Sequence, residues 1–170
     1  MKITATSLIM FLLFSAAISA QIRYKPEIRI GYGYYETFNI GLSLETLSYT
    51  RLGFGAGTNF QINNKSYYSL FIEDNVAVFR TRRYNFIEYK WFFTGKVIYW
   101  KMNDAQNRYN VLAISPALTR RIPLNSNLTL AIDAGPILNF VLSSRRKTDL
   151  ALDLPNYLMP NIRILLNLKL

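Results

Sequence analysis

Apolar side chains recur at every second position along much of the chain. In the final segment, Arg163, Asn167 and Lys169 alternate with five large aliphatic residues. Those five are Ile162, Ile164, Leu166, Leu168 and Leu170. Successive side chains of a β-strand point to opposite faces, so this pattern predicts a strand with one apolar face.

Runs of the same kind fill most of the remaining sequence. The eight expected strands cover residues 27–35, 40–49, 53–62, 67–79, 85–100, 109–119, 128–142 and 158–170. Turn-forming residues separate them, as in Asn63-Asn64-Lys65-Ser66. Outside the N-terminal segment, no long stretch has the 3.6-residue periodicity of an amphipathic helix. The sequence therefore predicts an all-β domain.

The two faces of the expected strands differ in kind. In the seventh run, Ile132 and Phe140 share a face, whereas Asp133 and Asn139 lie on the other. The third run sets apolar residues against the glycines of segment 53–57. Glycine weakens a solvent-facing strand, but small residues mixed with charges suit the crowded interior of a narrow transmembrane barrel. We therefore expect the apolar face outside and the polar face inside.

Charges assigned to the strand bodies balance, with five acids and five bases. One of the five acids is Asp74. The other nine charged residues are Arg29, Glu45, Glu73, Glu88, Lys90, Lys96, Asp133, Arg163 and Lys169. An unpaired buried charge costs several kcal/mol, so these nine residues are expected to form an ion-pair network in the lumen. Asp74 falls on the apolar face with Ile72, which indicates either a β-bulge after Glu73 or a different register.

The first 20 residues have the pattern of a secretory signal peptide. A positive start at Met1-Lys2 precedes an apolar stretch, residues 8–14, and a small-residue segment ending at Ala20. The apolar stretch is shorter than the roughly 20 residues that span a bilayer, although an N-terminal membrane anchor is the alternative. Cleavage after Ala20, with Ala17 as the alternative position, would leave one exported domain, residues 21–170.

Placing both ends of the barrel domain in the periplasm assigns the connections to two sides. The expected periplasmic turns are residues 50–51, 80–84 and 120–127. The expected outward loops are residues 36–39, 63–66, 102–108 and 143–157. The last is the longest, as extracellular loops of such barrels are, and we expect it to present the surface for partner contact.

With these features the chain resembles the small eight-stranded outer-membrane barrels, such as OmpX and the transmembrane domain of OmpA. The resemblance covers nearly all of residues 21–170 and implies an antiparallel up-and-down barrel in the bacterial outer membrane. In that family the alternating last strand is the signal read by the barrel-assembly machinery. The residues that match it are Ile162, Ile164, Leu166, Leu168 and Leu170. Leu170 stands where the family usually has an aromatic, and the Ala20-Gln21 junction is similar to leaders of Bacteroidetes proteins.

Basic residues gather in the expected turns and loops of a chain with a formal net charge of +10. Those expected to contact lipid phosphates are Arg80, Arg82, Arg83, Arg120, Arg121, Arg145, Arg146 and Lys147. Attraction to an anionic lipid surface is worth roughly 1 kcal/mol for each, either at a specific lipid site or simply as interfacial anchors. Outer-membrane lipids, including lipopolysaccharide, are the expected partners, and export argues against nucleic acid.

The composition argues against catalysis and metal binding, since the chain has no His and no Cys. Enzymes among the small outer-membrane barrels use histidine, whose pKa of about 6.5 suits proton transfer at neutral pH. Asp149 and Asp153 offer carboxylates for calcium, but Arg145, Arg146 and Lys147 nearby oppose a cation. We therefore expect neither enzymatic activity nor a cofactor.

Two functions follow from the two ways of orienting the faces. The first is a non-enzymatic outer-membrane barrel with a structural or interaction role, whose lumen is plugged by polar side chains. The alternative is a soluble secreted barrel of the lipocalin kind, with its apolar face inward around an apolar ligand. A subunit of a larger envelope complex would share the first fold.

Overall fold

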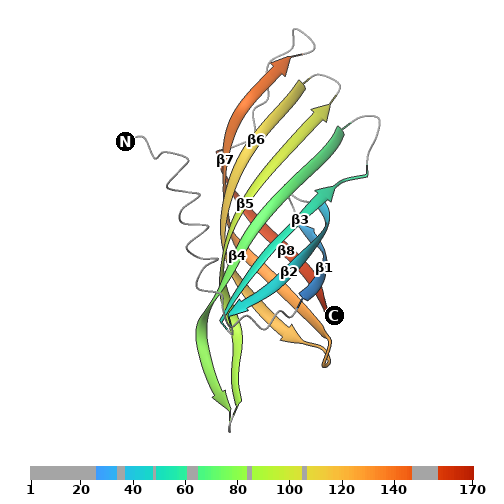
Figure 1. Cartoon of the computed structure of the whole chain (residues 1–170). Helices are drawn as coiled ribbons and strands as arrows, with labels where there is room; N and C mark the ends of the chain where they lie inside the picture. Colours follow the sequence, from blue (N-terminus) through green and yellow to red (C-terminus); the bar gives the residue numbers. More distant parts are fainter. Residues whose placement is uncertain are drawn as a thin grey trace.

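The computed structural model describes residues 26–33, 37–47, 49–60, 65–83, 86–104, 107–146 and 157–170. Eight antiparallel strands in chain order close into one barrel, in which β8 returns to pair with β1 (Figure 1). The strands are β1 Pro26–Gly33, β2 Thr37–Leu47, β3 Thr50–Thr58, β4 Lys65–Arg83, β5 Phe86–Asp104, β6 Asn107–Pro123, β7 Leu128–Arg146 and β8 Leu158–Lys169. The predicted all-β, up-and-down barrel of eight strands is confirmed.

The N-terminal segment 1–20, for which the sequence predicts a signal peptide, lies outside the described residues. Its assignment therefore stays a prediction, as does the extent of the mature domain. Within the described ranges, no helix combines the length and apolar character needed to cross a membrane.

Strands β4 to β7 extend further than the sequence predicts, and several expected connections are wrong. Residues 37–39, 50–51, 65–66, 80–83, 102–104, 107–108, 120–123 and 143–146 lie in strands rather than in turns or loops. Arg82 pairs with Ile87, for example, and Arg108 pairs with Arg145. Hydrogen bonding between strands uses the backbone, so a ladder continues where the side chains are no longer apolar.

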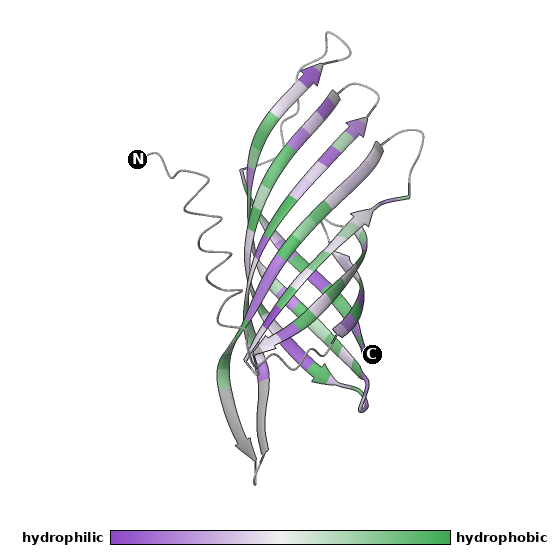
Figure 2. Ribbon diagram, in the orientation of Figure 1, coloured by the Kyte–Doolittle hydropathy of each residue, from purple (hydrophilic) through white to green (hydrophobic). Residues whose placement is uncertain are grey.

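Hydrophilic and hydrophobic residues alternate along the strands (Figure 2), and side chains alternate in the same way between the buried interior and the exposed outer surface. On β8, Arg163 and Asn167 are buried, whereas Ile162, Ile164 and Leu166 are exposed. Large apolar side chains are exposed on every one of the eight strands. The apolar face of the sequence pattern is thus the outer face of the barrel.

Asp74 also lies on the outer face, opposite Leu52 of β3 and Gly95 of β5. Neither explanation that the sequence suggested for it is correct. The ladder is regular at Glu73, and the irregularities of the β4–β5 pairing come later, around Phe79. Because Glu73 and Asn75 both point inward, regular alternation fixes Asp74 outward.

Two glycines of β3 leave room for long side chains inside the barrel. A Cβ atom at Gly53 would lie 2.0 Å from Nη2 of Arg29, and one at Gly55 would lie 2.6 Å from Cζ of Phe71. Gly95 faces outward, and a Cβ atom there would meet nothing within 4 Å. The inward glycines are therefore required by packing, whereas the outward one is not.

We predict that Gly53→Ala destabilises the barrel by about 1–3 kcal/mol, because the added methyl displaces the Arg29 guanidinium. The matched control, Gly95→Ala, should change stability by no more than about 0.5 kcal/mol. Equilibrium unfolding of the refolded protein in urea measures both values. Equal effects of the two substitutions would contradict this packing argument.

Candidate functional site

A fully buried carboxylate, Glu73 in the middle of β4, organises the charged interior. Nη1 of Arg163 donates to its Oε2 at 2.8 Å, and Arg29 donates to its Oε1. Nζ of Lys96 lies 3.9 Å from Oε2, and Nδ2 of Asn75 donates to Oε1 at 2.9 Å. Both carboxylate oxygens therefore have strong partners, which come from β1, β5 and β8 as well as from β4 itself.

Arg163 extends this cluster to a second buried carboxylate. Its Nε donates to Oδ2 of Asp133 at 2.7 Å, and the two residues are opposite each other in the β7–β8 ladder. The same guanidinium thus joins Asp133 to Glu73, on β4. We refer to Arg29, Glu73, Lys96, Asp133 and Arg163 as the Glu73 network.

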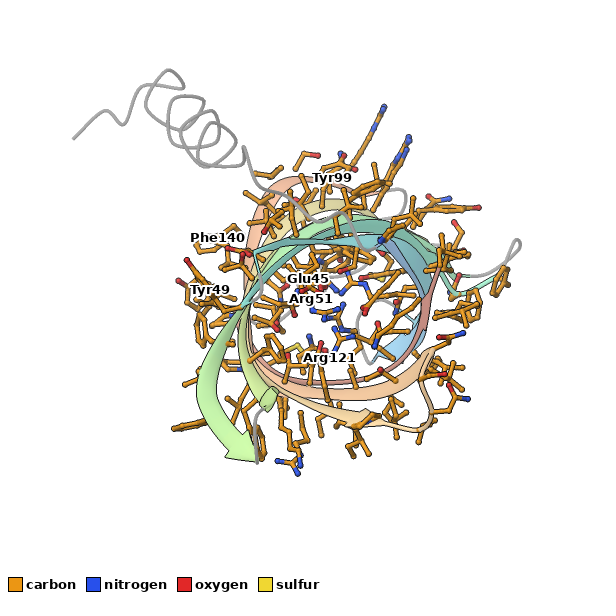
Figure 3. All side chains as sticks on the ribbon, turned by 60° about the horizontal axis from the view of Figure 1, so that its bottom comes forward. Glu45, Tyr49, Arg51, Tyr99, Arg121 and Phe140 are labelled. Atoms are coloured by element: carbon orange, nitrogen blue, oxygen red, sulfur yellow. The ribbon has the colours of Figure 1, made fainter. Side chains whose placement is uncertain are left out.

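A second ion-pair cluster lies where β1 and β3 begin and β2 and β6 end. Nη2 of Arg121 donates to Oε2 of Glu27 at 2.7 Å, and Arg51 donates to the other oxygen of Glu27. Nη2 of Arg51 also donates to Oε2 of Glu45 at 3.1 Å. Figure 3 shows Glu45, Arg51 and Arg121 inside the ring of strands. We refer to these four residues as the Glu27 network.

Apolar side chains fill another part of the interior, which the sequence analysis did not predict. The buried cluster consists of Tyr67, Phe71, Ile98, Trp100, Tyr109, Val111, Ala113 and Ile137. Phe71 borders the Glu73 network, because Nζ of Lys96 lies 3.9 Å from the centroid of its ring. The interior thus changes from ionic to apolar across Phe71.

The structure brings together most of the residues predicted for the lumen. Arg29, Glu73, Lys96, Asp133 and Arg163 meet in the Glu73 network, and Glu45 belongs to the Glu27 network. Lys169 is not part of either, since it is exposed and its Nζ donates to the carbonyl of Ser126 at 3.4 Å. Lys90 is half-buried, and the side chain of Glu88 lies outside the described part of the structure.

For Arg121, the prediction that its side chain contacts lipid phosphates is wrong. Its side chain points into the barrel and pairs with Glu27, because Thr119 and Arg121 have the same inward parity along β6. Arg120 faces outward, with its guanidinium 4.8 Å from the ring centroid of Trp91. Arg145 is exposed. No side chain is described for Arg80, Arg82, Arg83, Arg146 or Lys147.

Sequence reasoning missed Glu27 and Arg51 as lumen residues. The signal was nevertheless present in the sequence, because residues two apart on a strand share a face. Glu27 therefore shares the inward face of Arg29, and Arg51 shares that of Gly53. Both lie at strand ends: Glu27 is the first residue of the first expected strand and was not counted among the strand charges, and Arg51 was assigned to a turn.

The residues predicted as an assembly signal lie on the outer side of β8, except Leu170, which directly follows the strand. They are Ile162, Ile164, Leu166, Leu168 and Leu170, and each is exposed. β8 is also the strand that closes the barrel, through pairing with β7 and β1. Recognition of this strand during assembly stays a prediction.

Chemically, the two networks place four carboxylates against five cations, so every carboxylate has a cationic partner and the nine residues together carry a net charge of +1. Among the described residues, no group of three or more potential ligands is placed to hold a metal ion. Comparison of the chain with protein-family models, with curated proteins and with solved structures gave no match. The arrangement as it stands is a set of interior cross-links between strands.

We predict that Glu73→Gln destabilises the protein by about 3–5 kcal/mol, because it leaves three buried cations without their shared carboxylate. Glu45→Gln is the matched control, since Glu45 has one ion pair and is less buried. Glu45→Gln should lower the free energy of unfolding, measured with urea, by less than half as much as Glu73→Gln. A Glu73→Gln barrel as stable as the Glu45→Gln barrel would argue against the central role of Glu73.

Two adjacent arginines test the inward and outward assignments on β6. Arg121→Met should destabilise the barrel by about 1–3 kcal/mol, because Glu27 loses a hydrogen-bonded cation. Arg120→Met removes only a contact with Trp91 and should cost about 0.5–1 kcal/mol. Unfolding midpoints of the two variants compare them directly, and the reverse order would show that the assignments are exchanged.

Proposed function

We propose that this protein is an integral outer-membrane β-barrel without catalytic activity, with a structural role or a role in binding a partner. The observation that carries the proposal is the apolar outer surface around a closed barrel whose charges lie inside. Ile30, Leu42, Phe54, Ile72 and Ile164, on five different strands, are each more than 40% exposed. Monomeric soluble proteins rarely leave so large a contiguous apolar surface in water, whereas membrane barrels present one to lipid.

The pairing of the strands supports the same proposal. β1 pairs with both β2 and β8, so the barrel has no open edge. In hydrocarbon an unsatisfied backbone group costs several kcal/mol, and a sheet can cross a bilayer only when it is closed.

Aromatic residues on the outside are also placed as a membrane barrel requires. Tyr49, Tyr99 and Phe140 project outward from the ribbon (Figure 3), and each is exposed. Tyr49 follows β2 at one end of the barrel, whereas Tyr99 and Phe140 lie in the second halves of β5 and β7, toward the other end. Exposed aromatic residues toward both ends of the barrel suit the aromatic girdles that flank the apolar band of a membrane barrel.

One observation favours the alternative of a soluble barrel that binds an apolar ligand. The interior cluster around Tyr67 and Trp100 is apolar, and these two rings stack with centroids 5.3 Å apart. That alternative, however, would hold Glu73 and Arg163 inside while exposing Phe54 and Ile72 to water. We therefore rank it second.

The proposal also specifies which molecules would contact the barrel. Lipids of the outer membrane, including lipopolysaccharide, would contact its outer face, and the assembly machinery would insert it. The end of the barrel between β7 and β8 would face outward for a partner, although the predicted loop residues 147–156 lie outside the described part of the chain.

Fractionation of expressing cells, followed by gel electrophoresis in detergent with and without heating, tests this proposal. A stable membrane barrel is recovered with the outer membrane and migrates differently before and after heating. Recovery as a freely soluble periplasmic protein would overturn the proposal and favour the ligand-binding alternative.

A substitution on the outer face distinguishes lipid from water around it. Leu42→Arg should destabilise the vesicle-inserted protein by about 2–4 kcal/mol, because the charge would enter the apolar band. Leu42→Ala is the control for lost side-chain area. If the outer face meets water instead, Leu42→Arg would be tolerated at least as well as Leu42→Ala in unfolding experiments.

A further inference from the structure

Asp74 is a carboxylate on the apolar outer face. Its cross-strand neighbours are Leu52 on β3 and Gly95 on β5, and its own strand continues with Ile72 and Val76. The exposed apolar side chains around it are Leu52, Phe54, Ile72, Val76, Phe93 and Val97. Within the described part of the chain, Asp74 takes part in no ion pair.

The position of Asp74 along the barrel is central within this band. Its partner Gly95 lies on β5 between Trp91 and Tyr99, four residues from each. At about 3.3 Å per residue, each of these aromatics is on the order of 13 Å away along the strand. If these aromatics mark the two interfaces, and the strands tilt by about 35–45°, Asp74 lies on the order of 10 Å from each interface, within the apolar band and not at its edge.

Gly95 leaves open space beside the carboxylate. A Cβ atom at this position would meet nothing within 4 Å, and the residue opposite Gly95 on its other side is Pro116 of β6. Asp74 and Pro116 therefore flank a position without a side chain. A cationic group from outside can approach the backbone of Gly95 and reach the carboxylate laterally.

An ionisable residue in a membrane-embedded band is costly, and such residues usually mark functional sites with an ionic partner. A symmetric contact with a second copy would bring two Asp74 carboxylates together, which repel each other when both are ionised. Within the described residues of the band, the copy offers no exposed cation beside Asp74 to offset this repulsion.

We propose that Asp74 and Gly95 form a docking site, within the membrane, for another membrane-embedded protein. That partner presents a lysine or arginine on its lipid-facing surface, and the cation pairs with Asp74 while its stem packs over Gly95. This inference rests on the proposed membrane location. The barrel would then bind other proteins at two places, at its end between β7 and β8 and at this lateral surface.

The test uses the refolded barrel in phosphatidylcholine vesicles and two designed transmembrane peptides as probes. The peptides are leucine-rich helices that differ only in a central lysine or leucine. Energy transfer between a label on the barrel and a label on the peptide measures association. We expect the lysine peptide to associate at least tenfold more tightly than the leucine peptide.

Three variants identify the site. Asp74→Asn should abolish the preference for the lysine peptide, and Gly95→Leu should weaken it by filling the open position. Asp74→Leu should remain folded, because the carboxylate has no ion-pair partner in the described barrel to lose. A severe folding defect in Asp74→Leu would assign the residue to the fold and overturn the inference.

The remaining outcomes are also decisive. Equal binding of the two peptides overturns the docking site, as does an unchanged preference in Asp74→Asn. Self-association of the barrel that depends on Asp74 would replace the proposed partner with a second copy. Heat-modifiable migration and vesicle flotation, measured first, establish membrane insertion independently, so failure of the proposed function is distinguished from failure of this inference.

Discussion

Inside the closed barrel, the carboxylate of Glu73 lies between cations from β1, β5 and β8. Removing such a charge from water is costly, and its attraction to the cations compensates only when the geometry is good and the remaining hydrogen bonds are made. The surrounding sequence meets that condition: Asn75 donates to the same carboxylate, and Gly53 leaves space for the Arg29 side chain. Much of the local sequence thus follows from one buried acid.

The need to pair buried charges also explains how charged and apolar side chains are distributed between the two faces of the barrel. Most charged side chains of the strands that the structure describes are paired inside, and large apolar side chains are exposed on the outer surface of every strand. Beyond Phe71 the interior is filled by apolar side chains instead of ion pairs. An interior occupied in both parts suits a rigid barrel that presents surfaces to partners. Asp74 is an exception to this distribution, because it is a charged residue on the apolar outer face.

The alternation of side chains and the composition of the two faces allowed the strand number and the buried face to be predicted from the sequence, whereas the up-and-down strand order was implied by the resemblance to small outer-membrane barrels. Parity, together with the small and charged residues of one face, predicted that Arg29, Glu73, Lys96, Asp133 and Arg163 lie inside, which the ion pairs confirm. Strand ends were not predictable in the same way, because backbone ladders continue through polar residues. Arg121 was therefore assigned to a turn and to lipid, and its inward parity was overlooked. The pairing of Arg163 with both Glu73 and Asp133 required the register of strands distant in sequence.

The two tryptophans give the most direct test of the central claim, that the apolar face meets lipid while the charged face is enclosed. Trp91 lies on the outer face beside Arg120, and Trp100 is buried in the interior cluster. Fluorescence of the single-tryptophan variants Trp100→Phe and Trp91→Phe would be measured in vesicles containing brominated phospholipid. The account predicts strong quenching of Trp91 and little quenching of Trp100. Equal quenching of the two, or quenching of Trp100 alone, would contradict it.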